Sequence, residues 1–242
     1  NYFGFPVVWI EGEHYAEVGK GTRHRVVDFA TASRKGEPFE TFIAVYSIPN
    51  RTNPQCTQQL KAYPIKSYAR SIGWSRYHTA IGIRADEIDR ISTKAKAERL
   101  VYPLITERRM TKQKVNFWWS HQPFRLGLKG YQGNCKWCWK KSNPKLIRIA
   151  QEHPEHFAFP ASMEAKYGNY FPAHKVATRI ESGNPVPSNI TFFRGNRSAA
   201  DILELATRTP IVSVHDDAAD MNTQGELFDE SCEVFSECGI DN

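Results

Sequence analysis

The chain has 242 residues, of which 40% are hydrophobic, 12% aromatic and 24% charged, and this composition excludes a collagen-like, coiled-coil or disordered protein. Its formal net charge of +6 is uneven, because residues 216–242 hold nine acidic residues and no Lys or Arg, which leaves +15 on the rest of the chain. A body this basic favours polyanionic partners, such as nucleotides, sulfated or phosphorylated metabolites, or nucleic acid.

Short strands and helices are predicted to alternate along the first half of the chain. An apolar run with a β-branched pair predicts a buried strand over residues 5–10. Residues 39–46 fit a helix or a strand, since a short apolar run does not separate the two. A helix is predicted over 61–72, with Pro64 in its first turn, and a strand over 79–83 that ends at a glycine turn.

Helices dominate the second half of the chain. Thr111 is a predicted N-cap for a helix that runs to Trp119, and a short basic helix is predicted over 144–152. Pro154 can begin another helix. Residues 198–207 form an amphipathic pattern with three inward side chains, those of Ile202, Leu203 and Leu205.

This order of elements indicates an α/β fold with a parallel, helix-covered sheet. We divide the chain into an α/β nucleotide-binding-type core over residues 1–150, a helical extension over 151–209 and an acidic, flexible tail over 210–242. The nearly apolar stretches 6–10 and 42–48 are shorter than the roughly 18 residues that a membrane helix needs. We therefore expect a soluble, cytoplasmic protein with no membrane partner, whose five cysteines serve metal or redox chemistry.

A Cys-x-x-Cys pair, Cys135 and Cys138, is the strongest local signal. Two thiolates at this spacing can bind one metal ion through a single tight turn, and Gly133-Asn134 just before them are turn-forming residues. One pair is half of a zinc site or part of an iron-sulfur site. The alternative is a pair of small buried core thiols.

A second signal is the glycine-containing turn Gly82-Ile83-Arg84-Ala85-Asp86-Glu87. At the carboxyl end of a parallel strand, where open α/β sheets bind ligands, Arg84 can hold a phosphate or sulfate in a bidentate fork. Asp86 or Glu87 would orient the arginine or accept a hydrogen bond from a ribose hydroxyl. The alternative is a surface loop with ordinary ion pairs.

Aromatic and basic residues surround the thiol pair, and two histidines follow it. In the first group, the rings can stack on the bases of single-stranded nucleic acid while the lysines neutralise its phosphates. Alternatively, the same residues pack around a metal turn and hold a nucleotide phosphate. The group comprises Trp137, Trp139, Lys136, Lys140, Lys141 and Lys145. His153 and His156 have a helical spacing that can share a metal ion. Because no acidic or thiol ligand is expected beside them, we interpret them as a solvated helix start.

Four segments, taken in order, resemble the phosphoadenosine phosphosulfate (PAPS) reductase family of the adenine nucleotide alpha hydrolase-like superfamily, most closely its stand-alone phage and prophage members. The resemblance covers about residues 1–210. It rests first on a Cys-to-Pro segment at 56–65 and on the glycine-arginine-acid turn at 82–87. The other two segments are Tyr-Pro-Leu at 102–104 with the helix at 111–119, and Gly-Tyr … Cys-x-x-Cys at 130–138.

The resemblance implies a Rossmann-like parallel sheet and assigns roles to particular residues. Cys56, Cys135 and Cys138 would hold a 4Fe-4S cluster, with zinc as the alternative. The groups that contact an adenine sulfonucleotide or ATP would be Lys61, Arg84, Asp86, Glu87, Lys140 and Lys141.

The sequence departs from the family in two places. Cys56-Thr57 stands where cluster-bearing relatives have two cysteines, so three thiols remain, as in the tRNA-thiolating branch. A Ser-Gly-Gly-x-Asp-Ser phosphate loop, whose backbone amides would cradle the nucleotide phosphates, does not occur in the sequence. Since the chain begins at Asn1 and leads directly into an apolar run, we expect an incomplete N-terminus rather than lost nucleotide chemistry.

Near the end of the chain, Glu237-Cys238-Gly239-Ile240 resembles the terminal motif of thiol-dependent reductases, in which the cysteine attacks the sulfonucleotide sulfur. Cys238 is therefore the candidate catalytic residue. Its acidic neighbours should raise the thiol pKa, so it would react only when docked against the basic body. The alternative is a disordered tail with incidental cysteines.

The leading functional hypothesis is an oxidoreductase that reduces an adenylyl-sulfate-type sulfonucleotide, with a thiol donor protein as partner. One alternative is ATP-dependent sulfur transfer or modification of nucleic acid by the same fold. Another is a non-catalytic, metal-stabilised protein that binds polyanions and covers its basic face with the acidic tail. The enzyme hypotheses require the three thiols at positions 56, 135 and 138 to meet beside Arg84.

Overall fold

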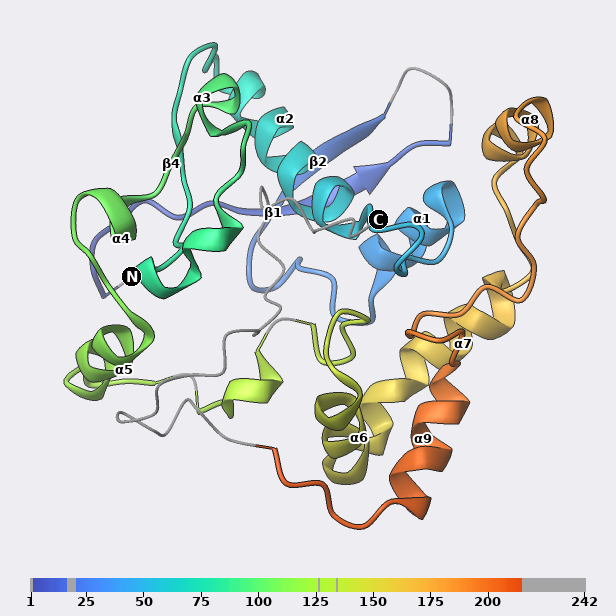
Figure 1. Ribbon diagram of the computed structural model, residues 1–242. Helices are drawn as coiled ribbons and strands as arrows, with labels where there is room; N and C mark the ends of the chain where they lie inside the picture. Colours follow the sequence, from blue (N-terminus) through green and yellow to red (C-terminus); the bar gives the residue numbers. More distant parts are fainter. Residues whose placement is uncertain (1, 17–20, 126, 134, 215–242) are drawn as a thin grey trace. The chain divides into compact units, whose positions relative to one another are not determined.

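The computed structural model describes residues 2–16, 21–125, 127–133 and 135–214 (Figure 1). The chain forms two units that interleave along the sequence. The first unit comprises Asn1–Ser75 and Ala158–Ala200, and the second comprises Arg76–Phe157 and Asp201–Asn242. The chain therefore returns to its first unit after residue 157, and the functional division into regions 1–150, 151–209 and 210–242 stays a prediction.

The first unit is built on an antiparallel hairpin. Strand β1 (Trp9–His14) pairs with β2 (Thr22–Val27), so that Trp9 lies opposite Val27 and His14 opposite Thr22. Helices α1 (Glu37–Tyr46) and α2 (Tyr63–Ser71) contact this hairpin, as Figure 1 shows. A single π-helical turn, η1 (Gln58–Ala62), leads directly into α2, and Pro64 lies in the first turn of α2 as predicted.

The buried strand predicted over residues 5–10 is wrong. The strand begins at Trp9, and the side chains of Phe5 and Val7 are 67% and 64% exposed. Because Trp9 pairs with the last residue of β2, residues 5–8 lie beyond the end of the ladder. An apolar run forms a buried strand only where a partner strand runs beside it.

Helix α1 resolves the ambiguous segment 39–46 in favour of a helix. It begins after Gly36, whose φ of 93° is left-handed, and a Cβ there would lie 2.5 Å from the ring of Phe159. Pro38 and two glutamates occupy its first turn, where a fixed φ and negative charge both favour helix formation. Phe42 and Ile43 are completely buried.

The remainder of the first unit comes from later in the chain. It contains α7 (Ala158–Tyr167), α8 (Ala173–Glu181) and the start of α9 (Ala199–Arg208). Glu164 of α7 accepts hydrogen bonds from the backbone N–H groups of Phe192 and Ala199, at 2.9 and 2.8 Å. This carboxylate therefore holds the first turn of α9 and the segment before it against α7.

The second unit contains a short parallel strand pair, β3 (Thr79–Ala80) and β4 (Leu100–Val101). Between and after the strands lie η2 (Ala85–Arg90), α3 (Ala95–Glu98) and α4 (Pro103–Thr106). A small core joins the elements around the strand pair, formed by Ile81, Ile83, Leu100 and Tyr102.

The helices of the second unit follow the sequence prediction closely. In α5 (Lys112–Ser120), the Thr111 hydroxyl caps the helix by accepting a hydrogen bond from the Lys114 N–H. Next come η3 (Gly130–Gln132), α6 (Asn143–Glu152) and η4 (Pro154–Phe157). In α9, Ile202 is fully buried, whereas Leu203 and Leu205 are only half-buried.

The protein is thus of mixed α/β class, with one antiparallel and one parallel strand pair in the part of the chain that the structure describes. The larger Rossmann-like sheet stays a prediction. Among the same residues, none of the helices combines the length and the apolar character that a bilayer crossing requires.

Candidate functional site

A pocket of about 290 Å³ lies in the first unit, between the segment after α1 and helix α8. Two different kinds of wall enclose it. The segment 47–55 supplies hydroxyl and amide groups, among them those of Ser47, Asn50 and Thr52. Helix α8 supplies basic and imidazole groups from His174, Lys175 and Arg179. Polar acceptors and donors on one wall and positive charge on the other suit a small anion.

Lys175 is a half-buried member of this wall. Its ammonium donates hydrogen bonds to the carbonyl oxygen of Tyr46 at 2.8 Å and to Asn53 Oδ1 at 3.4 Å. Burial, and then the charge of Arg179, lower the pKa of Lys175 below its ordinary value. Both acceptors are neutral, so an anion in the pocket would relieve the mutual repulsion of the two cations.

Ser47 forms an unusual part of the opposite wall. Its backbone has φ 74° and ψ 171°, a conformation that residues other than glycine rarely adopt. The residue is 1% exposed, and its Oγ has no hydrogen-bond partner among the described residues. A buried hydroxyl without a partner and a strained backbone are features that cluster at ligand sites.

Two hydrogen-bonded asparagines fix the loop that carries this wall. The Asn53 amide donates to the carbonyl oxygens of Tyr46 and Ile48, at 2.9 and 3.2 Å. The Asn50 amide donates to Thr191 O at 2.9 Å, which ties the loop to a segment 141 residues away. The pocket is therefore assembled by contacts that are distant in the sequence.

The predicted Cys56–Lys61 segment follows the pocket wall directly. Gln55 lines the pocket, Cys56 is next in the chain and half-buried, and Lys61 lies exposed on the π-helical turn η1. Gln59 of the same turn is buried and accepts a hydrogen bond from the Thr22 hydroxyl of β2. Single π turns of this kind are frequent at functional sites.

Arg84 of the predicted phosphate turn is held by its own neighbours. Its Nε lies 3.3 Å from Asp86 Oδ1, and its Nη2 lies 3.3 Å from Glu87 Oε1. Glu87 also pairs with Arg90, and Asp86 accepts a hydrogen bond from the Lys112 N–H at 3.1 Å. The ion-paired loop is therefore what the structure describes, and binding of a phosphate by Arg84 stays a prediction.

The Cys-x-x-Cys pair lies in two successive tight turns. The N–H of Cys138 donates to Cys135 O at 3.1 Å, and the N–H of Lys141 donates to Cys138 O at 3.0 Å. Cys135 is exposed and Cys138 is buried. Such a turn is the backbone geometry that presents two thiolates to one ion.

The aromatic and basic residues around this turn are divided between buried and accessible positions: Lys136 is exposed, and Trp137 and Lys145 are half-buried. Trp139, Lys140 and Lys141 are each less than 9% exposed. The Lys141 ammonium donates to the carbonyl oxygens of Tyr131, at 2.8 Å, and Gly133, while Lys140 lies over the Trp139 ring at 5.3 Å. Packing around the turn fits the contacts of these three residues, and stacking of bases on the half-buried Trp137 stays a prediction.

Glu152 of α6 anchors the segment that leads into the thiol turn. Its carboxylate accepts hydrogen bonds from Lys129 at 2.6 Å, from the Tyr131 hydroxyl at 3.0 Å and from Arg148 Nε at 3.0 Å. Burial acts to raise the pKa of Glu152, but hydrogen bonds from Lys129 and Tyr131 and the charge of Arg148 outweigh it, so the pKa lies below its ordinary value.

The predicted metal thiols are divided between the units. Cys56 belongs to the first unit, and Cys135 and Cys138 belong to the second. Their meeting at one cluster beside Arg84 stays a prediction. Cys238, together with the acidic tail, lies outside the described residues.

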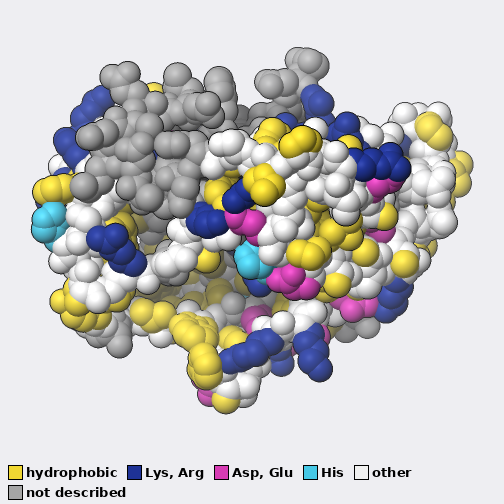
Figure 2. Space-filling model, turned by 90° about the horizontal axis from the view of Figure 1, so that it is seen from below, with side chains coloured by type: hydrophobic (Ala, Val, Ile, Leu, Met, Phe, Trp, Pro, Cys, Tyr) yellow, Lys and Arg dark blue, Asp and Glu magenta, His cyan; other side chains and the backbone are white. Residues whose placement is uncertain are grey.

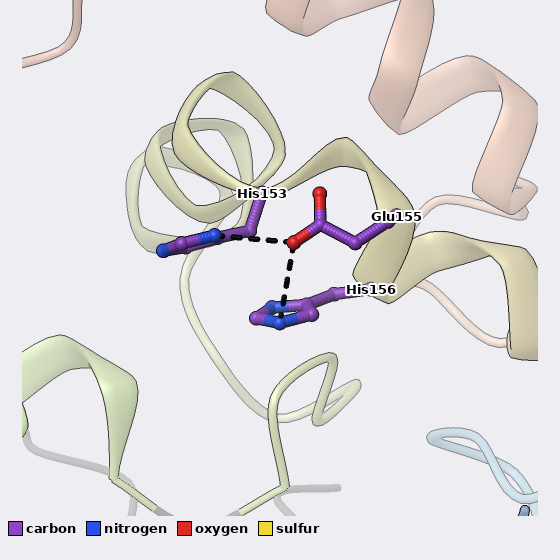
Figure 3. Close-up of side chains that lie close together, drawn as sticks. All are labelled: His153, Glu155 and His156. Carbon is purple, nitrogen blue, oxygen red and sulfur yellow. Dashed lines mark hydrogen bonds and ion pairs between the residues drawn. The ribbon is translucent and has the colours of Figure 1, made fainter.

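One expectation about metal ligands is wrong. We expected no acidic group beside His153 and His156, yet Glu155 lies between them, and the three side chains converge (Figure 3). The backbone turns sharply after α6, which brings together side chains that one continuous helix would have spread around its surface. The sequence signal was the His-Pro-Glu-His run itself.

The pocket on α8 was not predicted from the sequence, which indicated this helix only as part of a helical extension. The signal that could have indicated it is the spacing of Lys175 and Arg179, four residues apart on one helix face. The opposite wall could not have been found in this way, because it comes from more than 100 residues earlier in the chain.

Comparison with known proteins adds one relative. The chain is 25% identical over 244 aligned positions to the uncharacterized nin region protein ORF290 of Escherichia phage lambda, an alignment that covers 97% of this chain and 78% of that protein. No family model matches the sequence, and no solved structure matches it. The similarity thus points to a phage protein whose name assigns no activity.

The Glu152 network generates a prediction about stability. Replacing Glu152→Gln removes a charged acceptor from three donors, so the free energy of unfolding should fall by about 1–3 kcal/mol at pH 7. Because the folded pKa is lowered, the carboxylate stabilises the fold above its unfolded pKa of about 4.3 and loses this effect as pH falls through the folded value. Urea unfolding of both proteins between pH 3 and pH 8 measures this difference.

The matched control is Glu204→Gln, which removes an exposed carboxylate that pairs with Arg208 on α9. Such surface pairs contribute about 0–1 kcal/mol. Equal losses for the two variants, or a Glu152→Gln loss that does not shrink in acid, would contradict the role given to Glu152.

Proposed function

We propose that this chain binds an adenine sulfonucleotide through its pocket on α8 and takes part in thiol-dependent reduction of that ligand. The observation that carries the proposal is the pairing of Lys175 and Arg179 on one wall with the Ser47 hydroxyl on the other. Sulfate and phosphate groups present the several acceptor oxygens that such donors need. The Cys56 segment, on which the family resemblance partly rests, continues directly from the same wall.

The chemistry follows from the thiols. A thiolate, assigned to Cys238, attacks the sulfonucleotide sulfur, forms an S–S bond to the sulfonate group and releases the adenosine phosphate. A second thiol, from a donor protein, then attacks the cysteine sulfur and displaces sulfite. Two thiols are oxidised to one disulfide, and the sulfur passes from the oxidation level of sulfate to that of sulfite.

The basic pocket would bind the released phosphate oxygens and so stabilise charge on the leaving group. Cys56, Cys135 and Cys138 are the residues proposed to hold an iron-sulfur cluster or zinc. The tight turn at Cys135 fits half of such a site, since it places two thiol-bearing residues three positions apart on a closed backbone loop.

Nucleotide binding tests the pocket directly. Arg179→Gln should weaken binding of adenosine 3′-phosphate 5′-phosphosulfate by about 10- to 150-fold in calorimetry, because it removes a charge-assisted contact of about 1.5–3 kcal/mol. Lys166→Met is the matched control, since Lys166 is an exposed lysine of the same unit that pairs with Glu40. Unchanged affinity in Arg179→Gln would remove the pocket from the proposal.

The reductase step is tested with the same nucleotide and a reduced thiol donor. Wild-type protein should release sulfite, and Cys238→Ser should bind the nucleotide but release none. Sulfite release that survives in Cys238→Ser would remove that cysteine from the reaction. Failure of the wild type to bind the nucleotide at all would overturn the proposed function.

A second function, binding of single-stranded nucleic acid, has its own support. A groove of about 700 Å³ runs along α5 in the second unit. Its lining combines the cations and rings that hold unpaired bases, supplied by Arg108, Arg109, Lys114, Phe117, Trp118 and His121. Phe117 is 57% exposed. Figure 2 shows one face of the protein on which Lys and Arg side chains lie among hydrophobic ones.

If bases stack in this groove, Phe117→Ala should weaken binding of a fluorescent single-stranded oligonucleotide by about 5- to 150-fold, since one stacked base contributes about 1–3 kcal/mol. Ile211→Ala, which truncates another exposed apolar residue of the second unit, should leave the affinity unchanged. Fluorescence anisotropy at low salt measures both. Equal affinities for the two variants would reject this second function.

A further inference from the structure

Three metal-ligating side chains meet where α6 ends and η4 begins. Glu155 Oε1 lies 3.2 Å from His153 Nδ1 and 3.7 Å from His156 Nε2. One ligand atom from each of the three residues lies within 4.8 Å of the others. In Figure 3, dashed lines join one carboxylate oxygen of Glu155 to both imidazoles, whose rings stack with their centroids 4.8 Å apart.

These separations suit a first-row divalent ion. Zinc binds imidazole nitrogen and carboxylate oxygen at about 2.0–2.2 Å, so two ligands of a tetrahedral ion lie about 3.3 Å apart. The two distances to Glu155 bracket this value. The third separation, between the two imidazole ligand atoms, is within 4.8 Å, and rotation of the His153 side chain, which is 43% exposed, would shorten it.

His156 has unused hydrogen-bonding capacity. Its Nδ1 is buried and has no hydrogen-bond partner among the described residues. A neutral imidazole that binds an ion through Nε2, the nitrogen that faces Glu155, carries its proton on Nδ1, which is left to donate to water or to another outer acceptor. The contact with Glu155 alone does not satisfy this ring.

We propose that His153, Glu155 and His156 bind a divalent transition-metal ion of the Zn²⁺ class. Two imidazoles and one carboxylate form a three-ligand set that leaves coordination positions open to water or a ligand. The exposure of His153 and Glu155, 43% and 66% of their side chains, keeps these positions accessible to solvent. The site is separate from the thiols and does not rest on the proposed function.

Titration of the chelator-treated full chain with Co²⁺ and Zn²⁺ tests this site. The wild type should bind an ion whose Co²⁺ spectrum shows nitrogen and oxygen ligation and which survives in the Cys135→Ser/Cys138→Ser double variant. His153→Ala and His156→Ala should each weaken that binding at least about tenfold. His78→Ala, which removes an exposed imidazole of the same unit, is the matched control and should bind like the wild type.

The outcomes are distinct. Affinity in the His153→Ala/His156→Ala double variant equal to the wild-type affinity would overturn the site. Thiolate-to-cobalt absorption as the only signal, lost in the cysteine double variant, would also overturn it and assign the ion to the Cys-x-x-Cys turn. Thermal unfolding with and without Zn²⁺ checks that the variants fold, and the ion should raise the melting temperature of the control but not of the double variant.

Discussion

The placement of two positive charges on one face of α8, inside a pocket, is the constraint on which the functional account depends. Lys175 gives its hydrogen bonds to a backbone carbonyl and an amide oxygen, so neither acceptor neutralises it. Two cations one helical turn apart repel each other in a partly buried site. The opposite wall, where α1 ends, has an unfavourable feature of its own. Ser47 has a strained backbone conformation, and its buried hydroxyl has no partner among the described residues. An anion would satisfy both walls together, which is the basis of the proposed function.

In the second unit, hydrogen bonds hold the tight turn at Cys135 and Cys138 in place. Glu152 accepts hydrogen bonds from Lys129 and Tyr131 on the segment before Cys135 and from Arg148 of its own helix. Lys141 donates hydrogen bonds to carbonyl oxygens of the same segment. Trp139, Lys140 and Lys141, which the sequence allowed as part of a nucleic-acid surface, therefore pack within the turn. Directly after Glu152 the chain presents the His153–Glu155–His156 cluster, so the end of α6 supports two separate groups of potential ligands.

Local rules predicted those elements that local interactions determine. The cap at Thr111, Pro64 in the first turn of α2 and the helix from residue 144 all follow from the positions of single residues relative to a helix end. The strand over 5–10 failed because a strand depends on its partner, and β2 ends opposite Trp9. The pocket could not be predicted, because its two walls are distant in the sequence. A hydrogen bond from Asn50 to Thr191, 141 residues away, holds one of these walls in place. Glu155 was overlooked because the spacing of the histidines was read as one helix, whereas the backbone bends after Glu152.

Locating an anion directly is the sharpest test of the pocket on α8. A crystal of the protein soaked in selenate, a sulfate analogue whose selenium scatters X-rays anomalously, would show where such a group binds. The account predicts an anomalous peak within hydrogen-bonding distance of Lys175 Nζ and the Arg179 guanidinium, facing Ser47 Oγ. Selenate bound elsewhere on the basic surface, with this pocket containing only water, would contradict it.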